Sequence, residues 1–134
     1  MRLAVAVLAS VALLAACGFD VQSADLFQVT RTGQGQKLTL LVNDAGTIAC
    51  NGGKPKSLPD RLLLQARDLA TNLNKDASAK LHIPASARSV FSYTVKVQNG
   101  TFTFPDIAAN SRKELSQLEL FVVQAAADPC GISA

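Results

Sequence analysis

Alternating apolar and polar residues predict most of the β-strands. The clearest alternation runs from Val90 to Gln98, where Phe91, Tyr93, Val95 and Val97 fall on one face and smaller polar side chains on the other. Shorter patterns over 26–32 and 37–43 predict two earlier strands, and a short third strand is expected over 47–50. A last strand, over 101–104, is expected to pair with the 90–98 strand.

Glycine-containing segments predict hairpins between these strands. Gly33-Gln34-Gly35-Gln36 predicts one turn, and Asn99-Gly100 is a strong hairpin signal. Asp44-Ala45-Gly46 has the length of a three-residue hairpin loop. In that register Cys50 lies opposite Leu40 and points into the core, while Ile48 lies opposite Val42.

Apolar residues at helical spacing predict two helices. The first is expected over 58–74, after a capping box formed by Ser57 and Asp60, with residues 75–80 irregular. The second is expected to run to about Ala127, after a capping box formed by Ser111 and Glu114. Pro129 is expected to end the second helix.

The order of these elements, ββ(β)αββα, predicts an α+β fold. Hairpins pair antiparallel, and each helix has a single apolar stripe, so we expect a single antiparallel sheet of four to five strands with two helices packed on one face. The other face is expected to be open to water or to a partner. It would carry Gln28, Thr30, Ser92, Thr94, Lys96 and Gln98.

The first part of the chain has the pattern of an export signal. Arg2 precedes an apolar run from Leu3 to Leu14, and small residues follow. The run is shorter than the roughly 20 residues that a membrane-spanning helix needs. We therefore assign 1–16 to a signal peptide, 17–24 to a short N-terminal tether and 25–134 to one domain.

Leu14-Ala15-Ala16-Cys17 resembles the lipobox of bacterial lipoproteins. The resemblance implies that the signal is cut before Cys17, that this cysteine carries the lipid, and that the protein is anchored on the exported side of the cell membrane or outer membrane. The alternative is a plain secretory signal, with Cys17 an ordinary thiol.

The remaining cysteines, Cys50 and Cys130, allow one pairing. Outside the cytoplasm a disulfide is the default, so we predict a bridge between them. Two isolated cysteines and one histidine are a poor basis for a zinc site, which needs four ligands at short spacings. No metal site or other cofactor is predicted.

The charge pattern gives little reason to expect nucleic-acid binding. The formal net charge is only +3. The one basic cluster, formed by Lys54, Lys56 and Arg61, fits either a solvated loop or contact with anionic lipid headgroups. We therefore expect a membrane contact through the lipid anchor and an envelope or extracellular protein as partner.

Candidate catalytic residues are few. His82 is the single histidine and lies in no catalytic motif, so we interpret it as a partly buried structural residue. Glu114 is interpreted as a cap residue, Glu119 as an exposed helix residue, and Asp44 and Asp106 as turn residues. No pair of catalytic carboxylates is evident, and we do not expect an enzyme.

Three short motifs also carry a family resemblance. Arg31-Thr32-Gly33 follows the first strand, Phe91-Ser92-Tyr93-Thr94-Val95 precedes the Asn99-Gly100 turn, and a helix closes the chain. In this the segment 26–126 resembles emfourin, a small inhibitor of thermolysin-type metalloproteases with ββαββα order. The lipobox, both domain cysteines and the Gly33-Gln34-Gly35 turn depart from that pattern, and no inhibitory residue is transferred.

Two functional hypotheses follow from the sequence. The first is a membrane-anchored envelope lipoprotein whose domain binds a protein and is not catalytic. The second is an emfourin-like inhibitor of a thermolysin-type metalloprotease. An inhibitor needs an exposed extended segment, a scaffold needs an apolar patch, and an enzyme would need a pocket with converging polar groups around His82 or Asp106.

Overall fold

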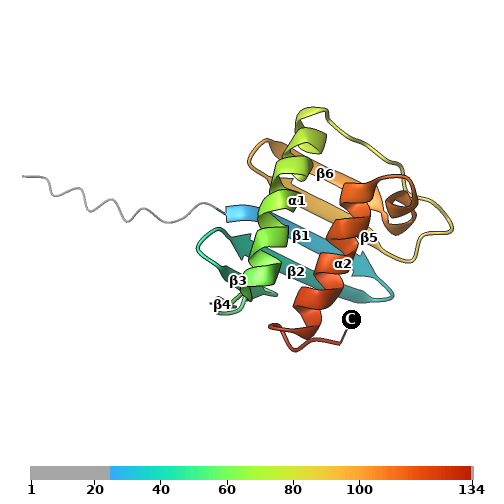
Figure 1. The fold of residues 1–134 in the computed structure, drawn as a ribbon. Coiled ribbons are helices and arrows are strands. Elements are labelled where there is room, and N and C mark those ends of the chain that lie inside the picture. Colours follow the sequence, from blue (N-terminus) through green and yellow to red (C-terminus); the bar gives the residue numbers. More distant parts are fainter. Residues whose placement is uncertain (1–24, 134) are drawn as a thin grey trace, which may run out of the picture.

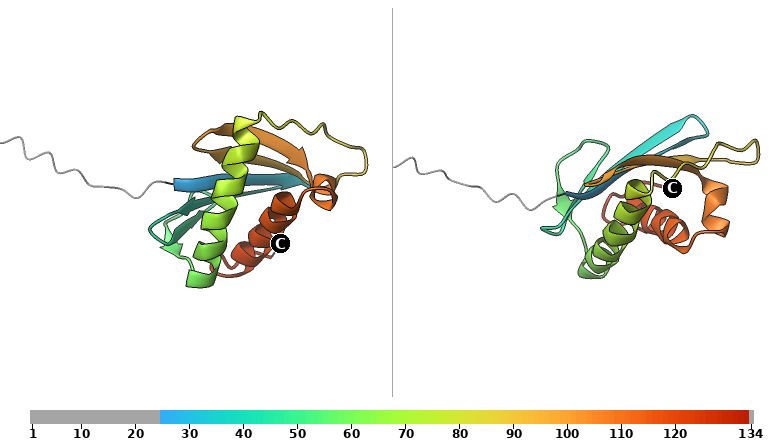
Figure 2. Two further views of the ribbon diagram at one scale, coloured as in Figure 1. Left: turned by 45° about the horizontal axis from the view of Figure 1, so that its top comes forward. Right: turned by 90° about the horizontal axis from the view of Figure 1, so that it is seen from above.

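A computed structural model describes residues 25–133 and confirms the α+β fold. Six strands form one antiparallel sheet in the order β4-β3-β2-β1-β5-β6, and both helices cover the same face (Figure 1). Seen from above, the opposite face of the sheet has no covering element (Figure 2). The strands are β1 (Asp25–Gly33), β2 (Gln36–Asn43), β3 (Thr47–Cys50), β4 (Lys56–Ser57), β5 (Ser92–Val97) and β6 (Gly100–Pro105).

The helices are α1 (Asp60–Ser78) and α2 (Lys113–Ala127), and a 3₁₀ turn, η1 (Asp106–Asn110), leads into α2. Neither helix within residues 25–133 is long and apolar enough to span a membrane. Their apolar stripes close the core over the inner face of the sheet. Within this core, Phe27 of β1 meets Phe121 of α2 edge to face at 5.6 Å between ring centres.

The hairpin predictions are largely confirmed. Residues 44–46 join β2 to β3, and Cys50 pairs with Leu40 in the expected register. The last hairpin differs by one position: Val97 pairs with Gly100, so Gln98 and Asn99 form its turn. The difference comes from a tertiary contact with α1. The backbone N–H of Asn99 donates a hydrogen bond to the side chain of Asn74, a residue of α1, at 2.9 Å.

The predicted capping boxes are wrong. Pro59 and Arg112 occupy the N-cap positions of α1 and α2, and neither cap has a side-chain hydrogen bond. Ser57 instead pairs with Thr47 as part of β4, a strand of two residues that no sequence pattern marks. The order of elements is nevertheless the predicted one, with β4 added.

Helix α1 begins two residues later and ends four residues later than predicted. Asp76 and Ala77 continue its buried stripe from Leu73, although Asp76 is polar and argued for an irregular segment. Strand β5 is also shorter than predicted. The backbone N–H groups of Val90 and Phe91 donate hydrogen bonds to the Asp106 side chain and not to β1.

The open face of the sheet is mostly polar, as predicted, although Leu41 and Ala49 also lie on it beside Gln28 and the expected Gln98 lies in the turn after β5. Thr39, Thr30, Thr94 and Thr103 form one row across β2, β1, β5 and β6. Gln28 and Lys96 form the neighbouring pair. This face therefore needs no covering layer to satisfy the hydrophobic effect.

Candidate functional site

Cys17 lies outside the described residues, so its lipidation stays a prediction. The described chain begins at Asp25, the first residue of β1. Strand β1 has neighbours on both sides in the sheet. A tether that ends at Ala24 would thus lead into the centre of the sheet.

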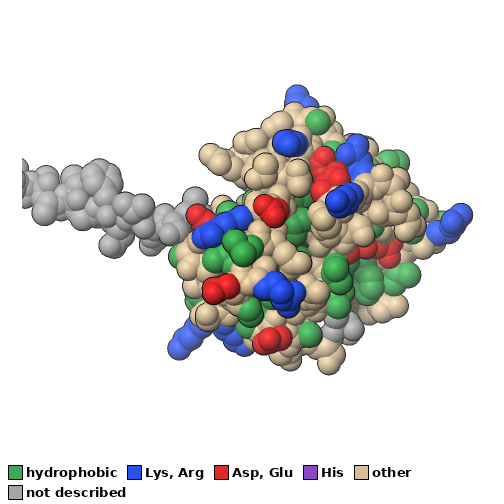
Figure 3. Space-filling view, viewed as in Figure 1, with side chains coloured by type: hydrophobic (Ala, Val, Ile, Leu, Met, Phe, Trp, Pro, Cys, Tyr) green, Lys and Arg blue, Asp and Glu red, His purple; other side chains and the backbone are tan. Residues whose placement is uncertain are grey.

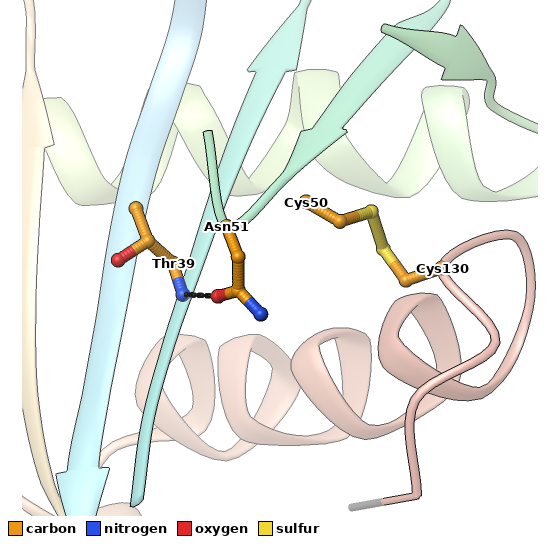
Figure 4. The surroundings of a disulfide bond; sticks show 4 residues. All are labelled: Thr39, Cys50, Asn51 and Cys130. Atoms are coloured by element: carbon orange, nitrogen blue, oxygen red, sulfur yellow. Dashed lines mark hydrogen bonds between the residues drawn. A yellow bond between two sulfur atoms is a disulfide. The ribbon is translucent and has the colours of Figure 1, made fainter. Parts of the chain in front are cut away.

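The predicted disulfide is present. Cys50, at the end of β3, is bonded to Cys130, just beyond α2, with a Cα–Cα distance of 5.9 Å (Figure 4). Beside it, Asn51 has a positive φ of 52° and is held by Thr39. The Asn51 N–H donates to the Thr39 carbonyl at 2.7 Å, and the Asn51 side chain accepts from the Thr39 N–H at 2.9 Å. The bridge therefore ties the sheet to the segment after α2.

Asp106 holds the end of a long loop. One oxygen of its carboxylate, Oδ2, accepts hydrogen bonds from the N–H groups of Val90 and Phe91, each at 3.1 Å. The other end of the 79–91 loop is fixed on α1, where the Leu81 N–H donates to the Asp76 carbonyl at 3.0 Å. His82 lies exposed on this loop, so the expectation of a partly buried histidine is wrong.

Glu119 was expected to be exposed, but it is half-buried and faces the same region as Asp106. Burial, and next the charge of Asp106, raise the pKa of Glu119 to about 7. Neither Glu119 Oε1 nor Asp106 Oδ1 has a hydrogen-bond partner among the described residues. Sequence reasoning missed this carboxylate pair, although residue 119 lies one turn from Leu115 and Val122, at the edge of the apolar stripe of α2.

Tyr93 interacts with both carboxylates and also with Arg31. Burial and the charge of Glu119 raise the pKa of Tyr93 to about 12, while the charge and hydrogen bond of Arg31 oppose the rise. Arg31 is only 6% exposed. Its guanidinium carbon lies 4.7 Å from the centre of the Phe91 ring, a cation–π contact. The sequence singled out Arg31 within a motif but gave no sign that it would be buried.

A second pair of carboxylates joins the two helices. Arg112 reaches Asp76 and Glu114, at 3.3 Å each. Burial, and next the hydrogen bond and charge of Glu114, raise the pKa of Asp76 to about 6. Burial opposes ionisation of Glu114, but hydrogen bonds from its own backbone, Asp76 and Arg112 leave its pKa lowered. Glu114 is thus a link between helices and makes no capping box.

The other sequence-predicted residues remain separate. Asp44 forms an exposed ion pair with Arg67 at 2.7 Å, far along the chain from Asp106. Within residues 25–133, no group of three or more His, Cys, Asp or Glu side chains is arranged to hold a metal ion. The polar residues that the fold does bring together are Arg31, Tyr93, Asp106 and Glu119, at the end of the sheet opposite Asp25.

No protein-family profile, curated protein sequence or solved structure matches this chain. The resemblances to lipoproteins and to emfourin therefore stay predictions. Function has to be inferred from the arrangement of the described residues.

Proposed function

We propose that this chain is a lipid-anchored protein of the bacterial envelope, whose disulfide-bonded domain binds another protein and has no catalytic role. The observation that carries the proposal is the Cys50–Cys130 bridge. Such bridges persist in oxidising compartments outside the cytoplasm, which agrees with an export signal. The bridge also accounts for both domain cysteines and leaves Cys17, directly after that signal, for the lipid.

The tether and β1 together give the anchored domain an orientation. Seven residues between Cys17 and Asp25 span at most about 25 Å. Strand β1 then runs from Asp25 to Gly33, which approaches the Val90 carbonyl and the Phe91 side chain. The end of the sheet that bears Gly33 and the 79–91 loop would face away from the membrane, toward a partner.

Exposed apolar side chains on the helices supply a surface for protein contact. Leu120 and Val123, one turn apart on α2, are 54% and 45% exposed, and Leu64 on α1 is 61% exposed. On the helix-covered side of the molecule, hydrophobic side chains gather over and beside α2 (Figure 3). Apolar groups grouped on one face favour a protein contact over a solvated surface.

Fatty-acid labelling tests the anchor. The wild-type chain should take up labelled palmitate in a host that processes lipoproteins and should sediment with membranes. Cys17→Ser should abolish the label and release the exported protein, whereas the control Ser23→Ala, in the same tether, should keep both. An unlabelled wild-type chain would refute the lipid anchor.

Cross-linking in envelope extract tests the protein-binding role. The anchored wild-type protein should capture one discrete partner, and Leu120→Glu should lose that partner. The control Thr101→Glu, an exposed position on the open face of the sheet, should keep it. The same partner on all three proteins would argue against the α2 surface. No partner on any of them would argue against the binding role.

One observation favours the second candidate, an inhibitor of a thermolysin-type metalloprotease. The 79–91 loop exposes His82, Pro84, Ala85, Ala87, Arg88 and Val90 and is fixed by hydrogen bonds at both ends. The loop turns at residues 86–89, where the Ser89 N–H donates to the Ser86 carbonyl at 3.0 Å. A loop held at both ends can enter a cleft without a large loss of entropy.

An activity titration tests the inhibitor. Residual activity of a thermolysin-type protease should fall to zero near one equivalent of added protein, and a gel should show the loop uncut. Undiminished activity at a large excess would remove this candidate and leave the envelope-binding role standing.

A further inference from the structure

Arg31 is a buried cation without an anionic partner. Among the residues described, no carboxylate lies within 4.0 Å of its guanidinium. Its contacts are with neutral groups, the Phe91 ring and the Tyr93 hydroxyl. Because removing a charge from water is costly unless an opposite charge compensates, the domain holds a cation that its own residues neutralise only in part.

A cavity of about 250 Å³ opens beside this cation, between the β1–β2 hairpin and the segment after Cys130. One water occupies about 30 Å³ of liquid, so the space has room for an oxyanion with several atoms attached. No acidic side chain borders the cavity. Lys37 lies at its rim, but its side chain alternates with that of Leu38 and lies on the open face of the sheet, away from Arg31. The remaining lining consists of Gln36, Leu38, Asn51, Ile132 and Ser133.

We propose that this cavity binds a carboxylate group of a ligand, with the guanidinium of Arg31 as the charged anchor. A guanidinium presents paired N–H donors whose spacing matches the two oxygens of a carboxylate. The amide groups of Gln36 and Asn51 and the Ser133 hydroxyl supply further donors around the same space. An acidic side chain of a peptide and a small organic acid both carry the group that this arrangement recognises.

The position of the cavity argues against a lipid phosphate. Arg31 lies six residues along β1 from Asp25, a distance of about 20 Å in a strand. If the anchor proposed above is correct, the cavity faces away from the membrane. Only this orientation depends on the anchor, because the binding of a carboxylate follows from Arg31 and the cavity alone.

The disulfide fixes both walls of the cavity. Asn51 follows Cys50 on one wall, and Ile132 lies two residues after Cys130 on the other. Two hydrogen bonds between Asn51 and Thr39 hold the first wall further. Figure 4 shows the one that the Thr39 N–H donates to the Asn51 side chain. The site is thus formed before a ligand arrives, which lowers the entropic cost of binding.

Titration followed by NMR tests the proposal. Sodium acetate and, separately, inorganic phosphate are added to the purified, disulfide-bonded protein at constant ionic strength, with chloride as the balancing anion. Acetate should give saturable shifts of the Arg31 side-chain N–H and of the Lys37, Asn51 and Ser133 amides, with a millimolar dissociation constant. Saturation by phosphate alone would overturn the carboxylate assignment, and the absence of saturable shifts with either anion would overturn the site.

Three variants separate this site from general charge attraction. Arg31→Met should weaken acetate binding about tenfold or more, because it removes the paired donors. Gln36→Ala changes an exposed residue on the same face of the sheet as Arg31 and should fold normally, so it keeps the test decisive if Arg31→Met does not fold. It removes an amide donor and should weaken binding about twofold to fivefold. Arg61→Met, the control, removes an equal charge on α1 and should leave binding unchanged. Equal affinity in Gln36→Ala and Arg61→Met would refute the cavity as the binding site.

These measurements are independent of the anchor. A protein that binds acetate but takes up no palmitate would refute the lipid anchor and leave the cavity assignment intact. A protein that takes up palmitate but does not bind acetate would refute the cavity assignment and leave the lipid anchor intact.

Discussion

The half-buried carboxyl of Glu119 makes the stability of this domain depend on pH. Its pKa is about 7 in the folded protein, against an ordinary value of 4.5, because burial and the charge of Asp106 disfavour the ionised form. The folded state thus binds the Glu119 proton more tightly than the unfolded state does. This contribution to stability is complete below about pH 4.5 and is lost as the pH rises to about 7.

The magnitude follows from the shift in pKa. One pKa unit corresponds to about 1.4 kcal/mol, so the rise from 4.5 to about 7 sets an upper limit of about 3 kcal/mol of unfolding free energy; solvent screening of this half-buried carboxyl reduces the contribution. Glu119→Gln keeps the shape of the side chain and cannot ionise. The variant should therefore match the wild type near pH 4 and exceed it by up to about 3 kcal/mol above pH 7.

Urea unfolding of both proteins between pH 4 and pH 9, with the disulfide intact, measures this difference. Asp76, whose pKa is about 6, titrates in both proteins, so its effect cancels in the comparison. Glu114→Gln on the same helix is the matched control and should show the opposite sign, because the pKa of Glu114 is lowered. A difference between Glu119→Gln and the wild type that stays constant across this pH range would refute the reasoning.

Three other substitutions test the remaining contacts. Replacing Cys50 and Cys130 with alanine removes a link between residues 80 apart and should lower the unfolding free energy by about 2–5 kcal/mol relative to the oxidised wild type. The wild type under reducing conditions should match the variant; an unfolding midpoint in the variant equal to that of the oxidised wild type would contradict the prediction. Asp106→Ala removes the acceptor of two N–H groups, so it should cost about 1–3 kcal/mol and speed hydrogen exchange at Val90 and Phe91, but not at Val95 in the middle of β5. Gly33→Ala places a Cβ against the Val90 carbonyl and should cost about 1–3 kcal/mol by thermal unfolding, whereas Gly35→Ala, also at positive φ but with open space around it, should cost less.

The sequence predicts the sheet and its helices well because their patterns are local. Alternation in β1, β2 and β5 and the helical stripe of α2 each follow from residues that are close together in the chain. Strand β4 and the extension of α1 through Asp76 were missed because they depend on contacts between distant segments. Ser57 pairs with Thr47, and Asp76 meets Arg112 of a later element.

The candidate sites also divide into those that the sequence could predict and those that only the complete fold reveals. The Cys50–Cys130 bridge could be predicted because only one pairing was available. The burial of Arg31 and Glu119 could not, since their charge argues for exposure and only the complete fold shows what surrounds them. The exposure of His82 was also misjudged, because its apolar neighbours Leu81 and Ile83 turn toward the core and leave it outside.

The central position of β1 has a mechanical consequence. A pull at Asp25 acts along a strand that is bonded to β2 on one side and β5 on the other, so both rows of hydrogen bonds bear the load in shear. A strand at the edge of the sheet, such as β6, would instead be peeled away one bond after another. Tension between an anchored tether and a partner held at the Gly33 end would therefore pass straight through the most strongly connected strand of the domain.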